Sequence, residues 1–377
     1  MKEKIISIIQ TNFKNSYSTN QTLIVKAERS LRNFRHQDKD IYSITLENDI
    51  GMQVVLSNYG ALIQKIIVPD RSGKPVDVVL GFDHLDSYFS EEYLKSYPYF
   101  GVIIGRYANR INNSAFQLEN RLIEVTKNNG YSQLHGGIEG FDKKIWNISE
   151  LKSVPNPTLV LNYLSADGEE GFPGTVNVQL TFVLTNTHEL ILEISATTDQ
   201  ATVINMTHHG YFNLNGDASS IEDHLIEIPA NYTLAQDENY VVTGELKSVQ
   251  NTAHDFNIEK PVNQNWDPEE GYDQAFVLNK PLGTWGKAAS AFSDKSGIKM
   301  EVFSNQPVVQ FYTAKHLNVG HGKNGETYTA FSAFCFETQV HPNAVNIPSF
   351  PTTVLQPGEV YNHKTSFKFG TRGQKLD

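Results

Sequence analysis

Short runs in which apolar and polar residues alternate cover most of the chain, and turn residues separate them. The clearest runs fall at residues 42–46, 53–57, 62–68, 159–164, 176–184, 190–197, 308–313 and 330–338. A side-chain period of two is typical of a β-strand with one buried face. Residues 69–73, Pro-Asp-Arg-Ser-Gly, lie after one such run and predict a hairpin connection. The pattern therefore predicts an all-β, antiparallel protein.

Helical periodicity is weak by comparison, and we expect only a few short helices. The best candidate is residues 84–96, where apolar side chains would share one face of a helix. Those side chains belong to Leu85, Tyr88, Phe89, Tyr93 and Leu94. We expect this segment to lie on the surface of the β body.

The sequence divides into an N-terminal extension and one domain. Residues 1–40 are polar and charged, and we treat them as an N-terminal extension that is partly helical, with one or two turns at residues 24–31. No repeat of fixed period, low-complexity tract or Pro-rich linker divides the remainder. We therefore expect residues 41–377 to form a single β domain.

Composition supports a large folded core and excludes some partners. Of the 377 residues, 39% are hydrophobic and 19% charged, and 21 Phe and 17 Tyr favour half-buried pleated surfaces. The formal net charge is -11, and no Lys/Arg stripe offsets it. Such a chain repels phosphate backbones and anionic headgroups, so we expect no nucleic-acid or membrane partner.

Cysteine usage and the first residues bear on the compartment. Cys335 is the single cysteine, so neither an intrachain disulfide nor a zinc site built on several cysteines can form. The first ten residues, MKEKIISIIQ, have a short apolar stretch but no small-residue cleavage site. We expect a cytoplasmic protein, and the sequence leaves its oligomeric state open between monomer and homodimer.

Several segments concentrate hydrogen-bonding side chains, as a site for a polyhydroxylated molecule requires. Residues 105–111 carry Arg106, Asn109 and Arg110, and residues 132–137 place His135 directly before two glycines. Glycines let the backbone approach a ligand closely. Taken alone, each segment is equally compatible with a solvated turn. The glycines at residues 136–140 do not make a nucleotide loop, because no phosphate-binding lysine follows them.

Two adjacent histidines, His208 and His209, lie in the polar and aromatic segment 205–214. Neighbours on a strand point to opposite faces, so only one of the two imidazoles can enter a given site. This spacing argues against a metal held by both, and we expect no metal.

One carboxylate ends an aromatic strand. Alternation over residues 331–339 puts Phe334, Phe336 and Thr338 on one face, and Cys335, Glu337 and Gln339 on the other. Glu337 either faces solvent or lies in a partly desolvated cleft. In the cleft its pKa would rise, which would suit a general base near neutral pH.

Taken in order, these segments resemble the aldose 1-epimerase (galactose mutarotase) family from about residue 41 to residue 369. The matching segments are residues 58–61, 105–111, 134–137, 166–174, 209–214, 271–273, 310–313 and 336–339. The resemblance implies a large antiparallel β-sandwich of the galactose mutarotase type, with an open sugar site on its concave face. It also implies an isomerase that interconverts the α and β anomers of free aldoses such as galactose or glucose, without a cofactor.

The family's site residues map onto this chain by position. Glu337 resembles the family's general base, and His209, which precedes Gly-Tyr-Phe-Asn-Leu, resembles its general acid, expected to act as imidazolium. The resemblance assigns sugar positioning to Asn109, Arg110, His135, Asp273 and Gln310. Arg106 is the neighbouring arginine and is not expected to reach the sugar.

Two departures from the family pattern adjoin the expected acid. The family often has Ser, Thr or Val where Gly210 stands, and commonly an amide where His208 stands. They leave open whether His208 contributes beside His209. Two other functions also stay open: an epimerase for a phosphorylated hexose, which would need a cluster of cations that we do not find, and a sugar-binding module without catalysis. The preferred aldose cannot be read from the sequence.

Overall fold

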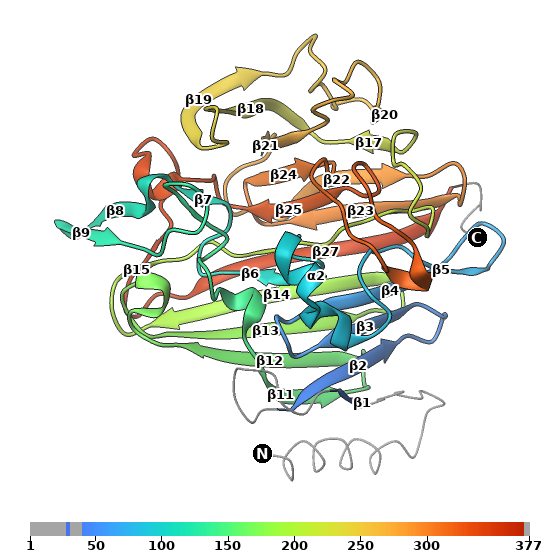
Figure 1. Ribbon diagram of the computed structural model, residues 1–377, viewed down its shortest axis with the longest axis horizontal. Coiled ribbons are helices and arrows are strands. Elements are labelled where there is room, and N and C mark those ends of the chain that lie inside the picture. The colour runs from blue at the N-terminus through green and yellow to red at the C-terminus, as the bar shows by residue number, and fades with distance from the viewer. Residues whose placement is uncertain (1–27, 31–39, 373–377) are drawn as a thin grey trace.

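A nine-stranded antiparallel sheet, the large sheet, forms one layer of the molecule. The computed structural model describes residues 28–30 and 40–372, and Figure 1 shows the chain as packed layers of strands. In spatial order the large sheet contains β11 (Asn147–Lys152), β12 (Thr158–Ser165), β13 (Val176–Leu184), β14 (Glu189–Thr198), β27 (Tyr361–Thr371), β23 (Ile298–Ser304), β22 (Gly286–Phe292), β17 (Leu225–Glu227) and β20 (Lys260–Pro261). The late strand β27 joins the two halves of this sheet.

Two five-stranded antiparallel sheets pack against the large sheet. The N-terminal sheet contains β1 (Glu28–Ser30), β2 (Ile41–Glu47), β3 (Gln53–Ser57), β4 (Ile63–Pro69) and β5 (Pro75–Asp77). The upper sheet, which lies at the top of Figure 1, contains β19 (Val242–Ser248), β18 (Ala230–Gln236), β21 (Asp273–Leu278), β24 (Val308–Tyr312) and β25 (Cys335–Gln339). One cluster of buried apolar side chains contains residues of all three sheets, so the layers form a β-sandwich.

Four two-stranded ladders and short helices complete the fold. The ladders pair β6 (Ile103–Ile104) with β16 (Thr207–His208), β7 (Arg110–Ile111) with β10 (Gln133–Leu134), β8 (Ala115–Leu118) with β9 (Arg121–Glu124), and β15 (Thr202–Val203) with β26 (Val354–Leu355). The helices are η1 (Leu85–Phe89), α2 (Glu91–Ser96), η2 (Asn112–Ser114), η3 (Phe141–Lys143), η4 (Glu169–Gly171), η5 (Lys323–Gly325) and η6 (Ala344–Asn346). In the described part of the chain, no helix is both long and apolar enough to cross a membrane.

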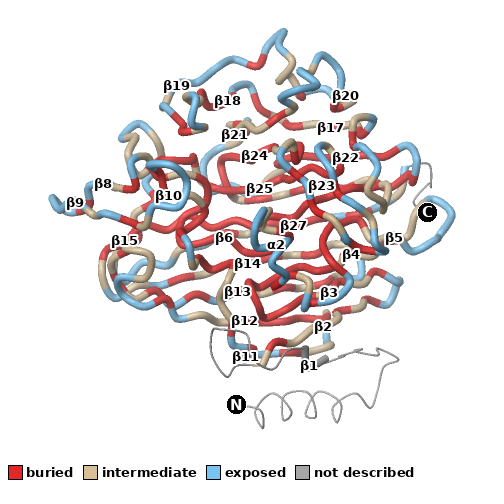
Figure 2. Tube along the Cα trace, viewed as in Figure 1, coloured by how far each residue is buried: buried red, intermediate tan, exposed pale blue. Residues whose placement is uncertain are grey.

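Alternation explains why the strands form where they do. In β13, every second side chain from Val176 to Leu184 is fully buried, and those between are more exposed. Figure 2 shows the buried residues concentrated along the packed strands. The predicted strands 53–57 and 176–184 are confirmed at both ends, and the predicted hairpin joins β4 to β5.

Three local predictions need correction. The predicted helix 84–96 is interrupted at Ser90, whose extended backbone separates η1 from α2 and resets the phase, so Leu94 is exposed. The predicted strand 330–338 begins only at Cys335, because Phe331 has a φ of 64° that a strand cannot contain. Glu28–Ser30 pair with β2 as a strand instead of forming a helical turn; the remainder of residues 24–31 lies outside the described residues.

Candidate active site

All seven predicted site residues line one pocket of about 320 Å³. They are Asn109, Arg110, His135, His209, Asp273, Gln310 and Glu337. Three of them come from neighbouring strands of the upper sheet, β21, β24 and β25, and the others come from the segments around β7, β10 and β16. Residues more than 200 positions apart in sequence therefore meet at one surface.

The register of β24 and β25 places Glu337 in this pocket. Gln310 and Glu337 are directly paired across the two strands, and their neighbours Phe311 and Phe336 belong to the core cluster. Because side chains alternate, Gln310 and Glu337 face away from that core. Glu337 is only 3% exposed, and its Oε2 has no hydrogen-bond partner among the described residues. Burial, with the nearby charge of Asp273, raises its carboxyl pKa well above the ordinary value.

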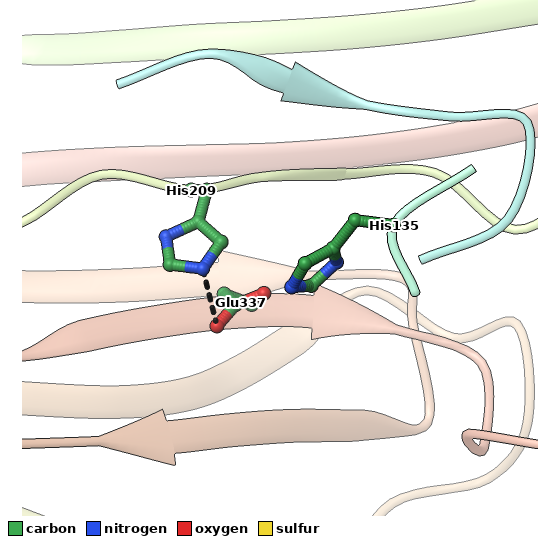
Figure 3. A group of neighbouring side chains, drawn as sticks. All are labelled: His135, His209 and Glu337. Atoms are coloured by element: carbon green, nitrogen blue, oxygen red, sulfur yellow. Dashed lines mark ion pairs between the residues drawn. The ribbon is translucent and has the colours of Figure 1, made fainter. Parts of the chain in front are cut away.

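His209 lies opposite this carboxyl group. Its backbone N–H donates to Val102 O, which continues the β6–β16 ladder by one residue. The imidazole stacks with the rings of Tyr99 and Tyr211, at ring-centroid distances of 5.8 and 5.1 Å. Its Nε2 is 3.6 Å from Oε1 of Glu337, as Figure 3 shows.

Burial also affects the charge of His209. Burial lowers the pKa of its imidazole to about 3, so the ring is neutral at neutral pH in the pocket as it stands. Glu337 is shifted in the opposite direction by the same cause. Burial therefore moves both pKa values toward the neutral forms of the two groups.

His208 points away from the pocket, as strand alternation requires. Its ring contacts Phe367 of β27 at 5.7 Å, and its Nε2 lies 3.1 Å from Gly101 O. Burial lowers the pKa of His208 to about 4, so it is a neutral core histidine. Of the two adjacent histidines, only His209 lines the pocket.

His135 is presented by a strained turn. Its φ is 53°, and Gly136 follows at φ 85°. A Cβ atom on Gly136 would lie 2.0 Å from Gly105 O, so this close approach requires glycine. His135 Nδ1 accepts the backbone N–H of Asn109 at 3.2 Å. Burial keeps the imidazole neutral by lowering its pKa, so Nε2 carries the hydrogen and can donate into the pocket.

A chain of amides and a carboxylate forms another wall of the pocket. Asn109 Nδ2 donates to Gln310 Oε1 at 3.4 Å, and Gln310 Nε2 donates to Asp273 Oδ1 at 2.6 Å. Arg110 Nε donates to Asn129 Oδ1 at 3.1 Å, and its guanidinium lies over the ring of Tyr240. These side chains hold one another in place and offer donors and acceptors suited to several hydroxyl groups.

Arg106, by contrast, does not line the pocket. Its guanidinium is buried and donates to Ser165 Oγ, Ala166 O and Pro173 O at 2.7–2.9 Å. It fixes the loop after β12 to the segment that carries Asn109 and Arg110. The expectation that Arg106 stays away from the site agrees with this placement.

Three side chains in the pocket have the spacing of a metal site. The ligand atoms of His135, His209 and Glu337 all lie within 4.8 Å of one another. However, Nε2 of His135 carries a hydrogen, because Nδ1 already accepts the N–H of Asn109. Coordination would require the opposite tautomer and would leave that backbone N–H without its partner. The donor set thus fits a hydrogen-bonded ligand better than a metal ion.

The sequence reasoning missed the aromatic part of the pocket, which comprises Tyr97, Tyr99, Tyr211 and Tyr312. Tyr211 and Tyr312 were within matched segments, and alternation could have assigned them to the faces of His209 and Gln310. Tyr97 and Tyr99 follow α2, and both have positive φ. No local pattern predicts where such a turn places its side chains.

The fold is a β-sandwich, and its pocket brings a carboxyl group and an imidazole together among side chains that can hydrogen-bond to a small polyhydroxylated molecule. A sequence profile described as aldose 1-epimerase matches residues 42–368. Galactose mutarotase from Homo sapiens is 41% identical over 332 residues, which cover 86% of this chain and 92% of that protein. Aldose 1-epimerase from Haemophilus influenzae is 35% identical over 336 residues, covering 86% and 95%.

Solved structures agree with these sequence matches. An aldose epimerase homologue from C. elegans superposes with a TM-score of 0.80 at 30% identity, covering 88% of this chain and 99% of that one. Galactose 1-epimerase from Lactobacillus acidophilus superposes with a TM-score of 0.78 at 26% identity, covering 92% and 99%. The chain belongs to the aldose 1-epimerase family.

Proposed function

We propose that this protein is a mutarotase that interconverts the α and β anomers of free aldoses such as galactose or glucose. The observation that carries the proposal is the pairing of Glu337 Oε1 with His209 Nε2 at 3.6 Å, inside a pocket lined by polar side chains. Anomer exchange requires one hydroxyl to lose a proton while the ring oxygen gains one. A single carboxyl and imidazole pair can do both.

The reaction begins with the pair in its charged form. In this form Glu337 is a carboxylate and His209 an imidazolium, and hydrogen bonds from sugar hydroxyls to the carboxylate would stabilise it. Glu337 then accepts the proton of the C1 hydroxyl, the bond between C1 and the ring oxygen breaks, and His209 Nε2 protonates that oxygen. Rotation about the C1–C2 bond presents the other face of the aldehyde, and the same groups close the ring in reversed roles.

The remaining pocket side chains would hold the open-chain sugar. Asn109, Gln310 and Asp273 already form one hydrogen-bonded chain, so little side-chain entropy is lost when they bind hydroxyl groups. Arg110 and the Nε2–H of His135 would donate to further sugar oxygens. Among the described residues that line the pocket, Arg110 is the single Lys or Arg side chain. A hexose phosphate would call for a cluster of cations, so a single arginine favours a free sugar.

Further properties belong to the same proposal. Residues 41–377 would act as one domain, and residues 1–40 would be an extension of it. The enzyme would work in the cytoplasm, as a monomer or homodimer, on a small-molecule substrate. The mechanism above requires neither a metal nor an organic cofactor.

Polarimetry on Glu337→Gln tests the proposal. With pure α-galactose and α-glucose, we expect the variant to lose about 10²–10⁴-fold in turnover, the usual contribution of one acid or base group. The fold should survive, as judged by circular dichroism, because glutamine has the same shape. The matched control is Glu150→Gln, which changes an exposed carboxylate of β11. A normal rate in Glu337→Gln would overturn the assignment, and saturable sugar binding without rate enhancement in the wild type would indicate a binding module.

A further inference from the structure

Both ring nitrogens of His209 face side chains of β25. Nε2 faces Glu337, and Nδ1 lies 3.7 Å from Cys335 Sγ, within hydrogen-bonding distance for sulfur. Cys335 precedes Glu337 by two residues, so both side chains project from the same face of the strand. Cys335 is fully buried and does not line the pocket. Its side chain reaches the pocket chemistry through its contact with His209.

We infer that Cys335 is a positioning residue whose sulfur accepts a hydrogen bond from Nδ1–H of His209, which leaves Nε2 to exchange protons with Glu337 and the sugar. This inference rests on the proposed function. It assigns a role in the reaction to the single cysteine of the chain.

The geometry around the ring supplies an acceptor for Nδ1. A neutral imidazole carries one hydrogen, on either Nδ1 or Nε2. Nδ1 faces Cys335 Sγ at 3.7 Å, and we place the hydrogen there, so that the lone pair of Nε2 faces Glu337 Oε1 at 3.6 Å. In the charged form, both nitrogens carry hydrogen. Nδ1–H is present in both forms, and a buried donor without an acceptor is costly.

A thiol suits this position because it binds weakly and stays neutral. Burial raises the pKa of Cys335 well above its ordinary value, and the charges of Glu337 and Asp273 act in the same direction. A carboxylate at this position would stabilise a permanent imidazolium, as a buried acid does for its histidine partner. The sulfur instead orients the ring while the proton remains free to move between Glu337 and Nε2.

Other groups around His209 could also affect the imidazole and its Nδ1. The rings of Tyr99 and Tyr211 stack with the imidazole, and the ring of His135 meets it edge-on at 5.3 Å. The titratable and charged groups that surround the ring are Tyr99, Arg110, His135, His208, Tyr211, Asp273, Tyr312, Cys335 and Glu337. The carbonyl group of His209 itself is the other acceptor close to the ring.

Two substitutions in the full-length protein test the inference. Cys335→Ala removes the acceptor, and we expect kcat to fall about fivefold, the equivalent of one hydrogen bond of about 1 kcal/mol. KM should stay nearly constant, because Cys335 does not line the pocket. Cys335→Ser supplies a stronger acceptor, so we expect most of kcat to return and the pH profile of kcat to shift to higher pH. In Cys335→Ala the same profile should shift to lower pH.

A spectroscopic measurement without sugar makes the test independent of activity. In wild-type protein labelled with ¹⁵N-histidine, His209 should show a protonated Nδ1 and an unprotonated Nε2 at pH 7. The control Val319→Ala removes a buried side chain from the same apolar cluster as Cys335 without touching His209, and it should leave the pH profile unchanged.

The outcomes separate this inference from the proposed function. A proton on Nε2 instead of Nδ1 in the wild type would overturn the inference, and so would pH profiles that both cysteine variants leave unchanged. Absence of mutarotation by the wild type with every aldose would overturn the proposed function, while the nitrogen resonances would still report on the contact with Cys335. If Cys335→Ala does not fold, the serine variant and the wild-type spectrum decide the matter.

Discussion

At Glu337 and His209, burial sets the chemistry by determining where one proton resides. Both groups are almost completely removed from water, so each prefers its neutral form. Water exclusion also strengthens every interaction that a charged form would make. The pair is therefore sensitive to a ligand that brings its own hydroxyl groups, since these can replace the missing solvation of the carboxylate.

Substitutions of the adjacent residues His208 and His209 should affect different properties of the protein. We expect His209→Asn to lower polarimetric turnover by about 10²–10⁴-fold, because it removes an acid–base group. His208→Asn should retain turnover and lower thermal stability, since His208 packs on Phe367 and bonds to Gly101 O. Turnover per folded molecule and the unfolding midpoint distinguish the two effects. The assignment of the acid is wrong if His208→Asn proves the more damaging change to turnover.

Gly210 depends on its neighbour His208. A Cβ atom on Gly210 would lie 2.5 Å from Cε1 of His208 and 3.0 Å from Cε2 of Phe212. These are the two positions at which the sequence departs from the family pattern. The two departures noted in the sequence are thus sterically coupled: the larger imidazole occupies the space that a side chain at position 210 would need.

We predict that Gly210→Ala lowers the free energy of unfolding by about 1–3 kcal/mol, the usual cost of overpacking a core. In a His208→Asn background the same change should cost less, because asparagine lacks the Cε1 atom. A double-mutant cycle measured by urea unfolding gives the coupling. Additive effects of the two substitutions would show that the cost of Gly210→Ala does not depend on His208, and would contradict the coupling. The contact with Phe212 remains in both backgrounds, so we expect partial rescue only.

Among the elements, the strands were more predictable than the turns that carry half of the site. The alternating pattern located β3 and β13 to the residue, because one buried face imposes a period of two. It also predicted that the side chains of Phe336 and Glu337 lie on opposite faces of β25. The pattern failed at residues 330–334, where Phe331 has positive φ and the chain turns before pairing begins. Local periodicity contains no information on such turns.

The site residues could be named from the family resemblance, but their contacts could not. Neighbouring positions 106 and 110 illustrate this, since both are arginines in one short segment. Arg110 lines the pocket, whereas Arg106 is buried against the loop after β12. The resemblance separates the two arginines by position, but only the structure shows what each guanidinium contacts. The charge of His209 could not be predicted from the sequence either, because its desolvation depends on packing against Tyr99, Tyr211 and strand β25.

The buried Arg106 connects two elements, and its loss should destabilise them without altering the chemistry. Arg106→Met would leave the oxygens of Ser165, Ala166 and Pro173 without their donor. We expect a loss of about 3–5 kcal/mol of unfolding free energy, as for removal of one partner from a buried charged network. Turnover per folded molecule should persist at low temperature. Arg121→Met, on the exposed strand β9, serves as control; equal stability of the two variants would contradict the structural role.

On the scale of the whole molecule, one connected core supports both the site and its surroundings. Strand β27 pairs with β14 on one side and with β23 on the other. A strand from the end of the described chain therefore joins the two halves of the large sheet. His363 on this strand contacts Thr338 of β25 at 3.1 Å. The strand that carries Glu337 is thereby attached to the layer beneath it by buried polar contacts as well as by apolar packing.

Many of these buried polar contacts involve neutral histidines, and this makes stability depend on pH. In the described part of the chain, burial lowers the pKa of eight histidines: His135, His188, His208, His209, His224, His254, His341 and His363. The unfolded chain titrates its histidines near pH 6.5. Below that pH the unfolded state binds protons that the native state does not, so acid favours unfolding. Burial raises the pKa of Asp142, Asp273 and Glu337, which opposes the trend with fewer groups.

We therefore predict that the unfolding midpoint is nearly constant above about pH 7.5 and falls steadily from there to pH 4. Each excess proton bound by the unfolded chain contributes about 1.4 kcal/mol per pH unit to this slope. His224, whose pKa burial lowers to about 4, accepts the N–H of Leu214 through Nε2. His224→Gln can keep an acceptor there without a titrating group, so its slope should be shallower. Calorimetry of both proteins at pH 7, 6, 5 and 4 provides the measurement, and a midpoint independent of pH over this range would contradict the neutral, buried state of these histidines.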